Sequence, residues 1–298
     1  MTVDVAVPTR TRTDAGQRQR SVPPGERVTG GISQVVMVAC TVLVVLPFLW
    51  TIMSSFKTSK QVLNSPFSLP DRLHFENYVS AWTKAGIGTF FVNTIIVVGG
   101  ALVLTMVLGS MCAYVLARFR FFGNRFIYLL MIAGLTFPIF LAIVPLFFIL
   151  KGVGLLGTLP GLAITYSAFA LPFTVFFMVP FFRALPVSVT EAAAIDGAGE
   201  WRTFFSVIVP MSTPAISTLS ILNFVGLWNQ FLLPVALNPD QNKYVLTQGM
   251  ASFAGTAGYS IDFGALFAAV VMTVVPVLIV YLVFQRALSG GVVIGSDK

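Results

Sequence analysis

The stretch that decides the fold is residues 186–214, PVSVTEAAAIDGAGEWRTFFSVIVPMSTP, which lies between two long apolar segments. Ser188 and Glu191 have the spacing of a capping box, in which the serine side chain accepts from an early helix N–H and the glutamate reaches back. The alanines after Glu191 favour continuation of the helix, and Gly197 can end it by adopting a positive φ. A second short helix is expected from about Glu200 to Val207. We therefore predict two short helices, joined by a glycine turn and exposed on one side of a membrane.

The composition indicates a membrane protein that crosses the bilayer several times. The 298 residues are 56% hydrophobic and only 10% charged, whereas ordinary globular chains carry about 25% charged residues. The net charge of +7 does not indicate nucleic-acid binding, because the basic residues lie at the ends of apolar segments, where they set orientation. Cys40 and Cys112 fall inside apolar segments, which argues against a structural disulfide. His74, the single histidine, lies in a loop; we expect it to be solvated and without partners, and we expect no metal site.

Six uncharged runs are each long enough to cross a hydrocarbon core of roughly 30 Å. They predict an all-α membrane domain over residues 32–285, with spans at about 32–56, 89–117, 126–150, 159–182, 208–237 and 263–285. Residues 1–31 are polar and basic and predict a disordered tail, and residues 286–298 form a C-terminal tail. The alternative for the first run is a cleaved signal peptide. However, the run is 25 residues long, which is longer than the apolar region of a signal peptide.

The distribution of lysine and arginine predicts the orientation. With the N-terminus inside, the inner segments hold Arg10, Arg12, Arg18, Arg20, Arg27, Arg118, Arg120, Arg125, Arg183, Arg202, Arg286 and Lys298, and the outer loops hold Lys57, Lys60, Arg72, Lys84, Lys151 and Lys243. The excess on the inner side favours an N-in, C-in topology. The same topology places residues 186–214 in the cytoplasm.

One motif in this stretch resembles the EAA loop of ATP-binding-cassette (ABC) importer permeases. That pattern is E-A-A, three residues, G, nine residues, then I-x-L-P; the chain has Glu191-Ala192-Ala193, Gly197 and Val207-Ile208-Val209-Pro210, with valine at the isoleucine and leucine positions. In that family the loop is the coupling helix, which seats in a groove of a cytoplasmic ATPase subunit. The resemblance implies this docking role for Glu191, Ala192, Ala193, Asp196, Gly197 and Trp201. A plain amphipathic connector, with Glu191 only capping a helix, is the alternative.

Further elements resemble the carbohydrate-uptake subgroup of these permeases. They are F-K-T-S, P-F-S-L-P and F-E-N-Y in the outer loop 57–88, Asn93-Thr94, the run 113–121, NFVGLWNQFLLP at 223–234 with Gln230 where aspartate is usual, and the tail QRALSGGVVIGSDK. Together they cover about residues 45–298, and the chain is similar to the smaller, six-span permease of the maltose system. In the tail, Ser296 and Asp297 depart from the family's ending, while Gly291, Gly295 and Lys298 match and would reach between the ATPases.

The resemblance also implies the rest of the assembly. It consists of a second homologous permease, two ATPase subunits and an extracytoplasmic solute-binding protein, in a bacterial cytoplasmic membrane. This chain would bind no cofactor and catalyse no reaction, because ATP and Mg²⁺ belong to the partner ATPases.

Independent of the resemblance, the sequence itself limits the transport mechanism. The predicted spans carry no charged residue, whereas proton- and sodium-coupled carriers usually place ionisable groups there. The chain contains no G-x-x-x-x-G-K-[ST] and therefore has no P-loop for nucleotide phosphates. Active transport would need energy from another subunit. A stand-alone secondary carrier or facilitator, and a purely structural scaffold, remain as alternatives.

Neutral polar residues inside the spans are candidates for a sugar path. They are Asn93, Tyr166, Asn223, Trp228, Asn229 and Gln230. Trp228 and Asn229 have a second interpretation, as caps at the outer end of the fifth span, since tryptophan favours membrane interfaces. Gly99-Gly100 and Gly109 allow close helix contact, which suits packing against a second permease.

Overall fold

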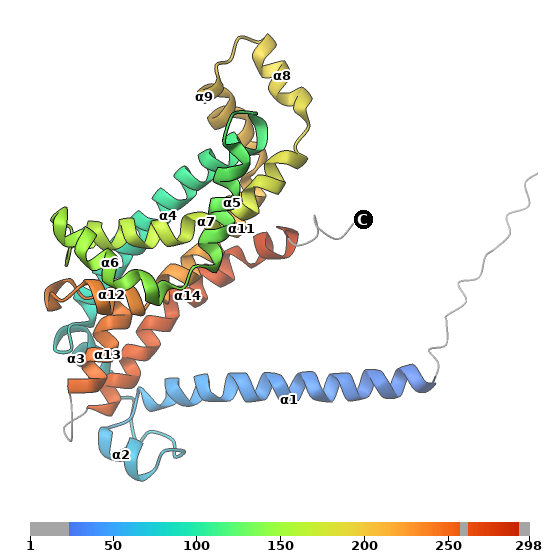
Figure 1. The fold of residues 1–298 in the computed structure, drawn as a ribbon. Coiled ribbons are helices and arrows are strands. Elements are labelled where there is room, and N and C mark those ends of the chain that lie inside the picture. Colours follow the sequence, from blue (N-terminus) through green and yellow to red (C-terminus); the bar gives the residue numbers. More distant parts are fainter. Residues whose placement is uncertain (1–23, 257–261, 292–298) are drawn as a thin grey trace, which may run out of the picture. The chain divides into compact units, whose positions relative to one another are not determined.

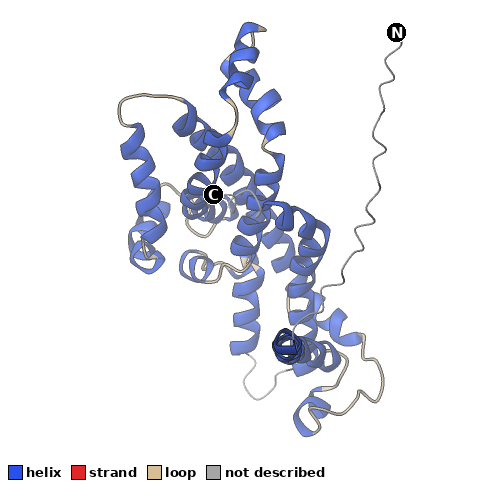
Figure 2. Ribbon diagram, turned by 90° about the vertical axis from the view of Figure 1, so that its right-hand side faces the viewer, coloured by secondary structure: helices blue, strands red, loops and turns tan. Residues whose placement is uncertain are grey.

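The computed structural model describes residues 24–256 and 262–291, which contain helices and loops and no strand (Figure 2). The chain divides into two compact units, residues 1–49 and 50–298, and each is considered by itself. The first unit holds most of α1 (Pro24–Ser54), which continues into the second. Helix α1 begins within the stretch that the sequence assigned to a tail; residues 1–23 of that tail lie outside the described residues.

The second unit is a bundle whose two ends carry different loops (Figure 1). One end carries α8 and α9, and the opposite end carries α2, α3 and α13. The helices are α2 (Ser59–Asn64), α3 (Glu76–Thr83), α4 (Ile87–Arg118), α5 (Asn124–Thr136), α6 (Ile139–Gly152), α7 (Leu159–Ala184), α8 (Val187–Ile195), α9 (Glu200–Thr203), the π-helical turn η1 (Phe204–Ile208), α10 (Val209–Met211), α11 (Thr213–Trp228), α12 (Leu232–Leu237), the 3₁₀ turn η2 (Gln241–Lys243), α13 (Leu246–Thr256) and α14 (Phe263–Gly291).

Four described helices are long and apolar enough to cross a membrane by themselves, which confirms the all-α membrane fold; they are Ser33–Ser54, Ile87–Arg118, Leu159–Ala184 and Phe263–Gln285. The expected spans 126–150 and 208–237 are not single helices. Helices α5 and α6 meet at 107°, and the α9–α10 segment meets α11 at 79°. The number of spans among the described residues is therefore four to six, and the six-span count and the orientation remain predictions.

Proline explains the first of these bends. Pro138 has no N–H to donate to the preceding turn, and it forces the residue before it out of helical geometry. Phe137 accordingly has an extended backbone, with φ −72° and ψ 120°, between α5 and α6.

The centre of the second unit is the packing of α4 against α7. A Cβ atom on Gly109 would lie 2.8 Å from Thr174 Cγ2, and one on Gly100 would lie 3.7 Å from Ala163 Cβ. The absence of a side chain at Gly109 lets the two helices of one chain approach closely, whereas a Cβ on Gly100 would make only an ordinary van der Waals contact. A Cβ on Gly99 would meet no described atom within 4 Å. The expected packing of these glycines against a second permease stays a prediction.

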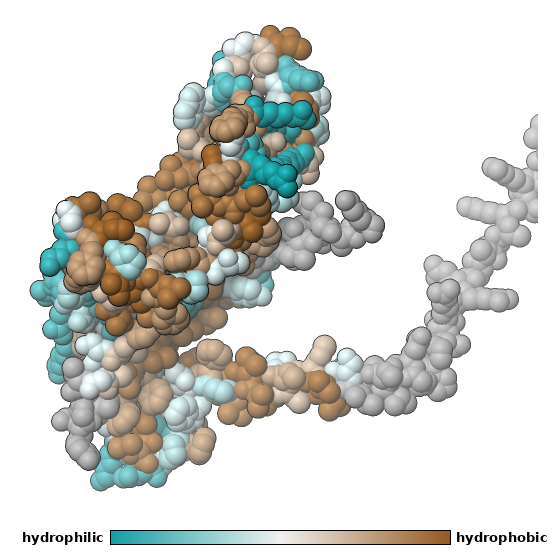
Figure 3. Space-filling model, viewed as in Figure 1, coloured by the Kyte–Doolittle hydropathy of each residue, from teal (hydrophilic) through white to brown (hydrophobic). Residues whose placement is uncertain are grey.

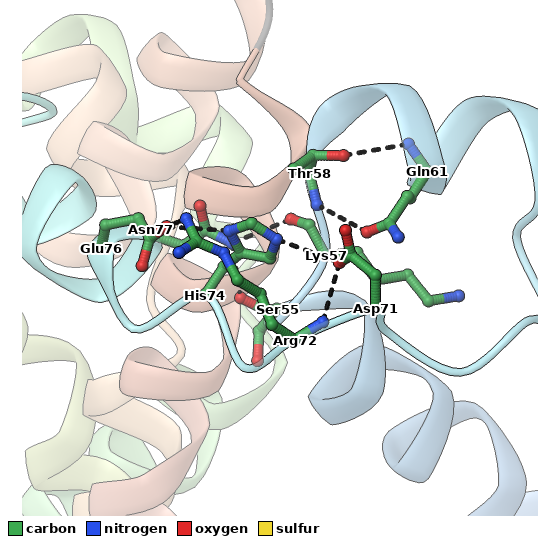
Figure 4. Close-up of polar contacts among 9 residues, drawn as sticks. All are labelled: Ser55, Lys57, Thr58, Gln61, Asp71, Arg72, His74, Glu76 and Asn77. Carbon is green, nitrogen blue, oxygen red and sulfur yellow. Dashed lines mark hydrogen bonds and ion pairs between the residues drawn. The ribbon is translucent and has the colours of Figure 1, made fainter.

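At the end opposite α8, the loop between α1 and α3 is organised around Lys57 (Figure 4). The Lys57 side chain is fully buried, and its Nζ donates to the carbonyls of Ser65 and Pro66, at 3.2 and 2.9 Å. Asn77 Nδ2 donates to the carbonyls of Ser55 and Lys57, at 2.8 and 2.9 Å. Burial lowers the pKa of the Lys57 amine. The loop is thus closed by side chains that bind main-chain carbonyls.

His74 belongs to the same structure, and the prediction that it is solvated and without partners is wrong. Its Nδ1 lies 2.8 Å from Glu76 Oε1, and its Nε2 lies 3.1 Å from Asp71 Oδ1. The backbone N–H of Arg72, and then His74, hold the pKa of Asp71 below its ordinary value. The backbone N–H of Glu76 itself, and then His74, do the same for the pKa of Glu76. Single-sequence reasoning missed this cluster because residues 71–76 fold back on themselves.

Candidate functional site

The first helix of the stretch 186–214 starts differently from the expectation. Helix α8 begins at Val187, and its N-cap residue is Pro186, with φ −59° and ψ 132° and no side-chain capping bond. Ser188 already has helical backbone, so it cannot serve as the N-cap residue. The predicted capping box of Ser188 and Glu191 is therefore wrong, because the extended backbone of Pro186 starts the helix earlier.

The end of α8 is the predicted glycine turn. Gly197 has φ +75°, and its N–H donates to the carbonyl of Ala194 at 3.0 Å. The N–H of Ala198 donates to the carbonyl of Ala193 at 2.9 Å. These two bonds satisfy carbonyls that a helix end otherwise leaves unpaired. No described atom lies within 4 Å of where a Gly197 Cβ would stand, so only the backbone conformation demands glycine here.

The segment from α8 to α9 exposes large apolar side chains and three acidic ones. The acidic residues are Glu191, Asp196 and Glu200. Ile195 is 87% exposed and Trp201 is 66% exposed, and the Trp201 ring stacks on Phe205 with centroids 6.1 Å apart. Within α8 only Ala193 is buried; Ala192 is exposed. The turn between α8 and α9 thus presents two large apolar side chains beside carboxylates.

Ile195 is an addition that the sequence reasoning missed. The motif directs attention to E-A-A and to the glycine, whereas Ile195 is the last residue of α8. A large apolar residue at the end of a short exposed helix, next to a glycine turn, is the signal that would have found it.

The second helix is shorter than predicted and changes type. Helix α9 covers only Glu200–Thr203, and the π-helical turn η1 (Phe204–Ile208) follows. In this turn the N–H of Val209 donates to the carbonyl of Phe204, five residues earlier. Pro210 follows and has no N–H to donate back into the helix. The irregular turn therefore lies where the stretch enters the bundle.

Buried aromatic side chains attach this turn to the bundle. Phe204 is buried, and its ring lies 5.2 Å from that of Tyr114 on α4. The Tyr114 ring also lies 5.9 Å from that of Phe182 on α7. Arg118 Nη2, at the end of α4, donates to the carbonyl of Leu185 between α7 and α8, at 2.8 Å. The exposed surface is thus fixed to both central helices.

Three of the candidate path residues line one cavity. A cavity of about 280 Å³ is bounded by α6, α7 and α11, and Tyr166, Asn223 and Gln230 line it together with Phe169 and Phe173. Asn223 Nδ2 donates to Thr174 Oγ1 at 2.9 Å. This arrangement combines amide groups with aromatic rings in a space otherwise lined by apolar side chains.

The structure places the other candidates elsewhere. Asn93 Nδ2 donates to the carbonyls of Asn242 and Tyr244, and so ties α4 to the turn η2. Trp228 is buried, and its Nε1 donates to the carbonyl of Thr273 on α14. Asn229 is exposed, and its side chain bonds within its own helix. Gly291 is the last residue of α14, and Gly295 and Lys298 lie outside the described residues.

Comparison with known proteins decides the family. Residues 105–293 match the family described as the inner membrane component of binding-protein-dependent transport systems. The chain belongs to this family. It is therefore a multi-pass permease subunit of an ABC importer in the cytoplasmic membrane.

Relatives of this permease cover almost its full length. It is 60% identical over 279 residues to the diacetylchitobiose uptake system permease protein NgcG of Streptomyces coelicolor, with 94% of this chain and 92% of the relative covered. It is 31% identical over 253 residues to the trehalose transport system permease protein SugB of Mycobacterium tuberculosis, with 85% and 92% covered.

A solved structure supports the fold of the permease. One chain of a bacterial ABC transporter involved in the import of the acidic polysaccharide alginate superposes with a TM-score of 0.78 at 23% identity, covering 89% of this chain and 98% of that chain. At this identity the likeness concerns the fold alone. The bends at α5–α6 and α10–α11 therefore lie within an ABC permease architecture.

Proposed function

We propose that this permease carries an acetylated amino-sugar disaccharide, or a closely related oligosaccharide, into the cell, driven by a partner ATPase that grips α8 and α9. The substrate class rests on the relative named for diacetylchitobiose uptake, which shares 60% of its residues over nearly the whole chain. The complex contains a second homologous permease, two ATPase subunits and an external solute-binding protein. ATP and Mg²⁺ are bound by the ATPases.

The observation that carries the coupling role is the construction of the α8–α9 turn. Its outer surface exposes Glu191, Ile195 and Trp201, while its inner surface is held by Phe204 against Tyr114. This surface is open to a partner protein and is packed against α4 and α7. Movement of the bound ATPase would therefore move these two helices. Interface centres favour tryptophan and apolar anchors surrounded by polar residues.

The cavity that contains Tyr166, Asn223 and Gln230 supplies the groups that a neutral sugar needs. Amide groups donate and accept hydrogen bonds, and aromatic rings present flat faces to sugar C–H groups. The cavity lies beside the α5–α6 bend, because Ile139 at the start of α6 also lines it. We propose that Asn223 and Tyr166 contact the passing sugar.

The coupling role is tested by purifying the tagged permease from its native membrane in mild detergent and measuring the ATPase that accompanies it. Glu191→Lys reverses a charge on the exposed surface, and we expect it to remove the ATPase. Trp201→Ala removes an exposed anchor, and we expect it to reduce ATPase recovery at least tenfold, the range of interface hot spots. Equal ATPase recovery with wild type and both variants would falsify the docking role.

The substrate is tested with the same preparation. The complex is reconstituted in liposomes with its binding protein, and uptake of labelled diacetylchitobiose is measured with and without ATP. We expect uptake only with ATP and binding protein. Uptake by the isolated permease without ATP would instead establish a facilitator, and ATP-driven uptake of a different sugar in preference would overturn the substrate assignment alone.

A further inference from the structure

A basic cavity lies next to the turn between α8 and α9, and the proposed function does not use its arginine cluster. Its volume is about 800 Å³. It lies between the end of α4, the start of α5, the end of α7 and the α8–α9 turn. Its charged lining residues are Arg118, Arg120, Arg125, Arg183 and Glu200. Four arginines against one glutamate make the cavity strongly positive.

These arginines are not neutralised by the protein. Among the described residues, none of the four has a carboxylate within 4.0 Å, although the outer-loop residues Arg72 and Lys243 do. Arg183 lies over the ring of Tyr128, with Cζ 5.5 Å from the centroid. Arg118 Nε is buried and has no hydrogen-bond partner among the described residues. Arg118 Nη2 donates to the carbonyl of Leu185, so one buried N–H of the guanidinium is left without an acceptor, which costs free energy.

The rim of the cavity is apolar and aromatic. Phe121 and Phe126 line it, and Phe126 is 70% exposed. The arginines lie at helix ends: Arg118 is the last residue of α4, and Arg183 is one residue from the end of α7. Lysine and arginine gather at the ends of membrane helices, at the depth of the lipid headgroups, and Phe121 and Phe126 add apolar surface beside them. Figure 3 shows hydrophilic surface at the end that carries α8 and α9, next to apolar surface over the helices below.

We propose that this cavity binds the phosphate-bearing headgroup of an anionic membrane lipid, whose acyl chains lie along Phe121 and Phe126. Arginine guanidinium groups bind phosphate oxygens in bidentate geometry, and basic pockets between membrane helices bind anionic headgroups. The two phenylalanines at the rim favour a lipid over an acidic protein segment. The acyl chains of a lipid would cover these apolar rings, whereas the carboxylates of a protein segment would need only the arginines.

The occupant would touch α8 and α9. Val187 and Thr190 of α8, and Glu200 of α9, line the cavity together with the arginines. A bound phosphate would therefore join the arginines of the α4–α5 segment to Arg183 of α7 through charge-assisted hydrogen bonds and would lie against α8. The inference goes beyond the proposed function, since the binding of lipid requires neither ATP nor sugar.

The test measures lipid bound to the intact importer complex by native mass spectrometry. Wild type and the double variant Arg120→Gln/Arg125→Gln are reconstituted in nanodiscs of phosphatidylcholine containing phosphatidylglycerol, then released and analysed. Both arginines are exposed and hold no other element. We expect the variant to retain phosphatidylglycerol about tenfold less than wild type, from the loss of two phosphate contacts. Arg202→Gln, on the same turn but outside the cavity lining, is the control and should retain the lipid.

Three other results would each overturn the lipid proposal. Equal phosphatidylglycerol retention by wild type and the double variant overturns the proposal. If a millimolar excess of inorganic phosphate raises the Tm of the wild-type complex in pure phosphatidylcholine, and phosphatidylglycerol is not retained, the site takes a free anion and the lipid assignment fails. If lipid retention is unchanged and the ATPase is lost from the double variant, the cavity is a protein contact. Retention is measured without ATP or sugar, so a failed coupling role leaves the result interpretable.

Discussion

The ring of Phe204 lies 5.2 Å from the ring of Tyr114, and this contact joins the segment that carries α8 and α9 to α4. Phe204 is the first residue of the π-helical turn, and Tyr114 is one turn from the end of α4. Tyr114 also packs on Phe182 of α7, so one ring connects three segments. Movement of α8 and α9 therefore reaches both central helices through packed side chains.

Removal of the Phe204 ring should uncouple the permease. Phe204→Ala leaves a cavity beside Tyr114 and should cost about 3–5 kcal/mol of local packing energy. We expect ATP hydrolysis by the assembled complex to persist while sugar uptake falls at least tenfold. The comparison variant is Phe205→Ala, which keeps the Phe204–Tyr114 contact and removes the ring that stacks on Trp201, so we expect it to lower ATPase recovery instead. Loss of uptake with retained ATP hydrolysis in both variants would show that the buried contact is not the connection.

Gly197 should be irreplaceable because of its backbone alone. Gly197→Val forces a β-branched residue to φ +75°, at a cost of about 1–2 kcal/mol or more. The control is Gly199→Val, because Gly199 has φ −71° and equally open surroundings. We expect Gly197→Val to reduce ATPase recovery and uptake, Gly197→Asn to restore part of both, and Gly199→Val to behave like wild type. Normal uptake by Gly197→Val would argue against a rigid turn.

Asn223 should affect the handling of sugar rather than the fold. Asn223→Ala removes a cavity-lining amide and should raise the KM of uptake several-fold, for a hydrogen bond of about 1 kcal/mol. Thr174→Val removes the same Asn223–Thr174 bond without removing the amide from the cavity, and it is the control. A KM change of equal size in both variants would assign Asn223 a structural role.

Substitutions at Gly109 and Gly99 should distinguish packing within the chain from packing between two permease subunits. Both lie on α4. Gly109→Val places atoms against Thr174 and should lower the Tm of the permease by several degrees, because overpacking costs about 1–3 kcal/mol. Gly99→Val meets no described atom and should leave Tm unchanged; if Gly99 faces a second permease, recovery of that subunit falls instead.

The loop of residues 57–78 should loosen in acid. The pKa values of Asp71 and Glu76 are lowered in the folded state, so their stabilising effect is complete above the unfolded values of about 4 and is lost as pH falls below them. Hydrogen exchange of residues 57–78 should therefore stay constant down to about pH 4 and rise as the pH falls below it, relative to Asp71→Asn/Glu76→Gln at the same pH. A constant difference between wild type and variant across this range would contradict a titrating cluster.

Local sequence chemistry predicted a large part of this permease. Apolar runs longer than a bilayer core predicted membrane helices at 89–117 and 159–182, close to α4 (Ile87–Arg118) and α7 (Leu159–Ala184). The glycine at position 197 predicted the turn at the end of α8, because only glycine adopts a positive φ without strain. These features depend on neighbouring residues, which is why one sequence was enough to find them.

Contacts between distant residues were decided only by the tertiary structure. The approach of α7 to α4 placed Thr174 against Gly109, and the fold of the loop between α1 and α3 placed two carboxylates beside His74. Asn93 turned out to bind main-chain carbonyls, while Asn223, of the same residue type, lines a cavity. The cavity with four arginines likewise joins helix ends that are far apart in the chain. Residue type and spacing determined the helices and the exposed turn, whereas the packing of the helices determined which polar groups are satisfied and which remain free to bind.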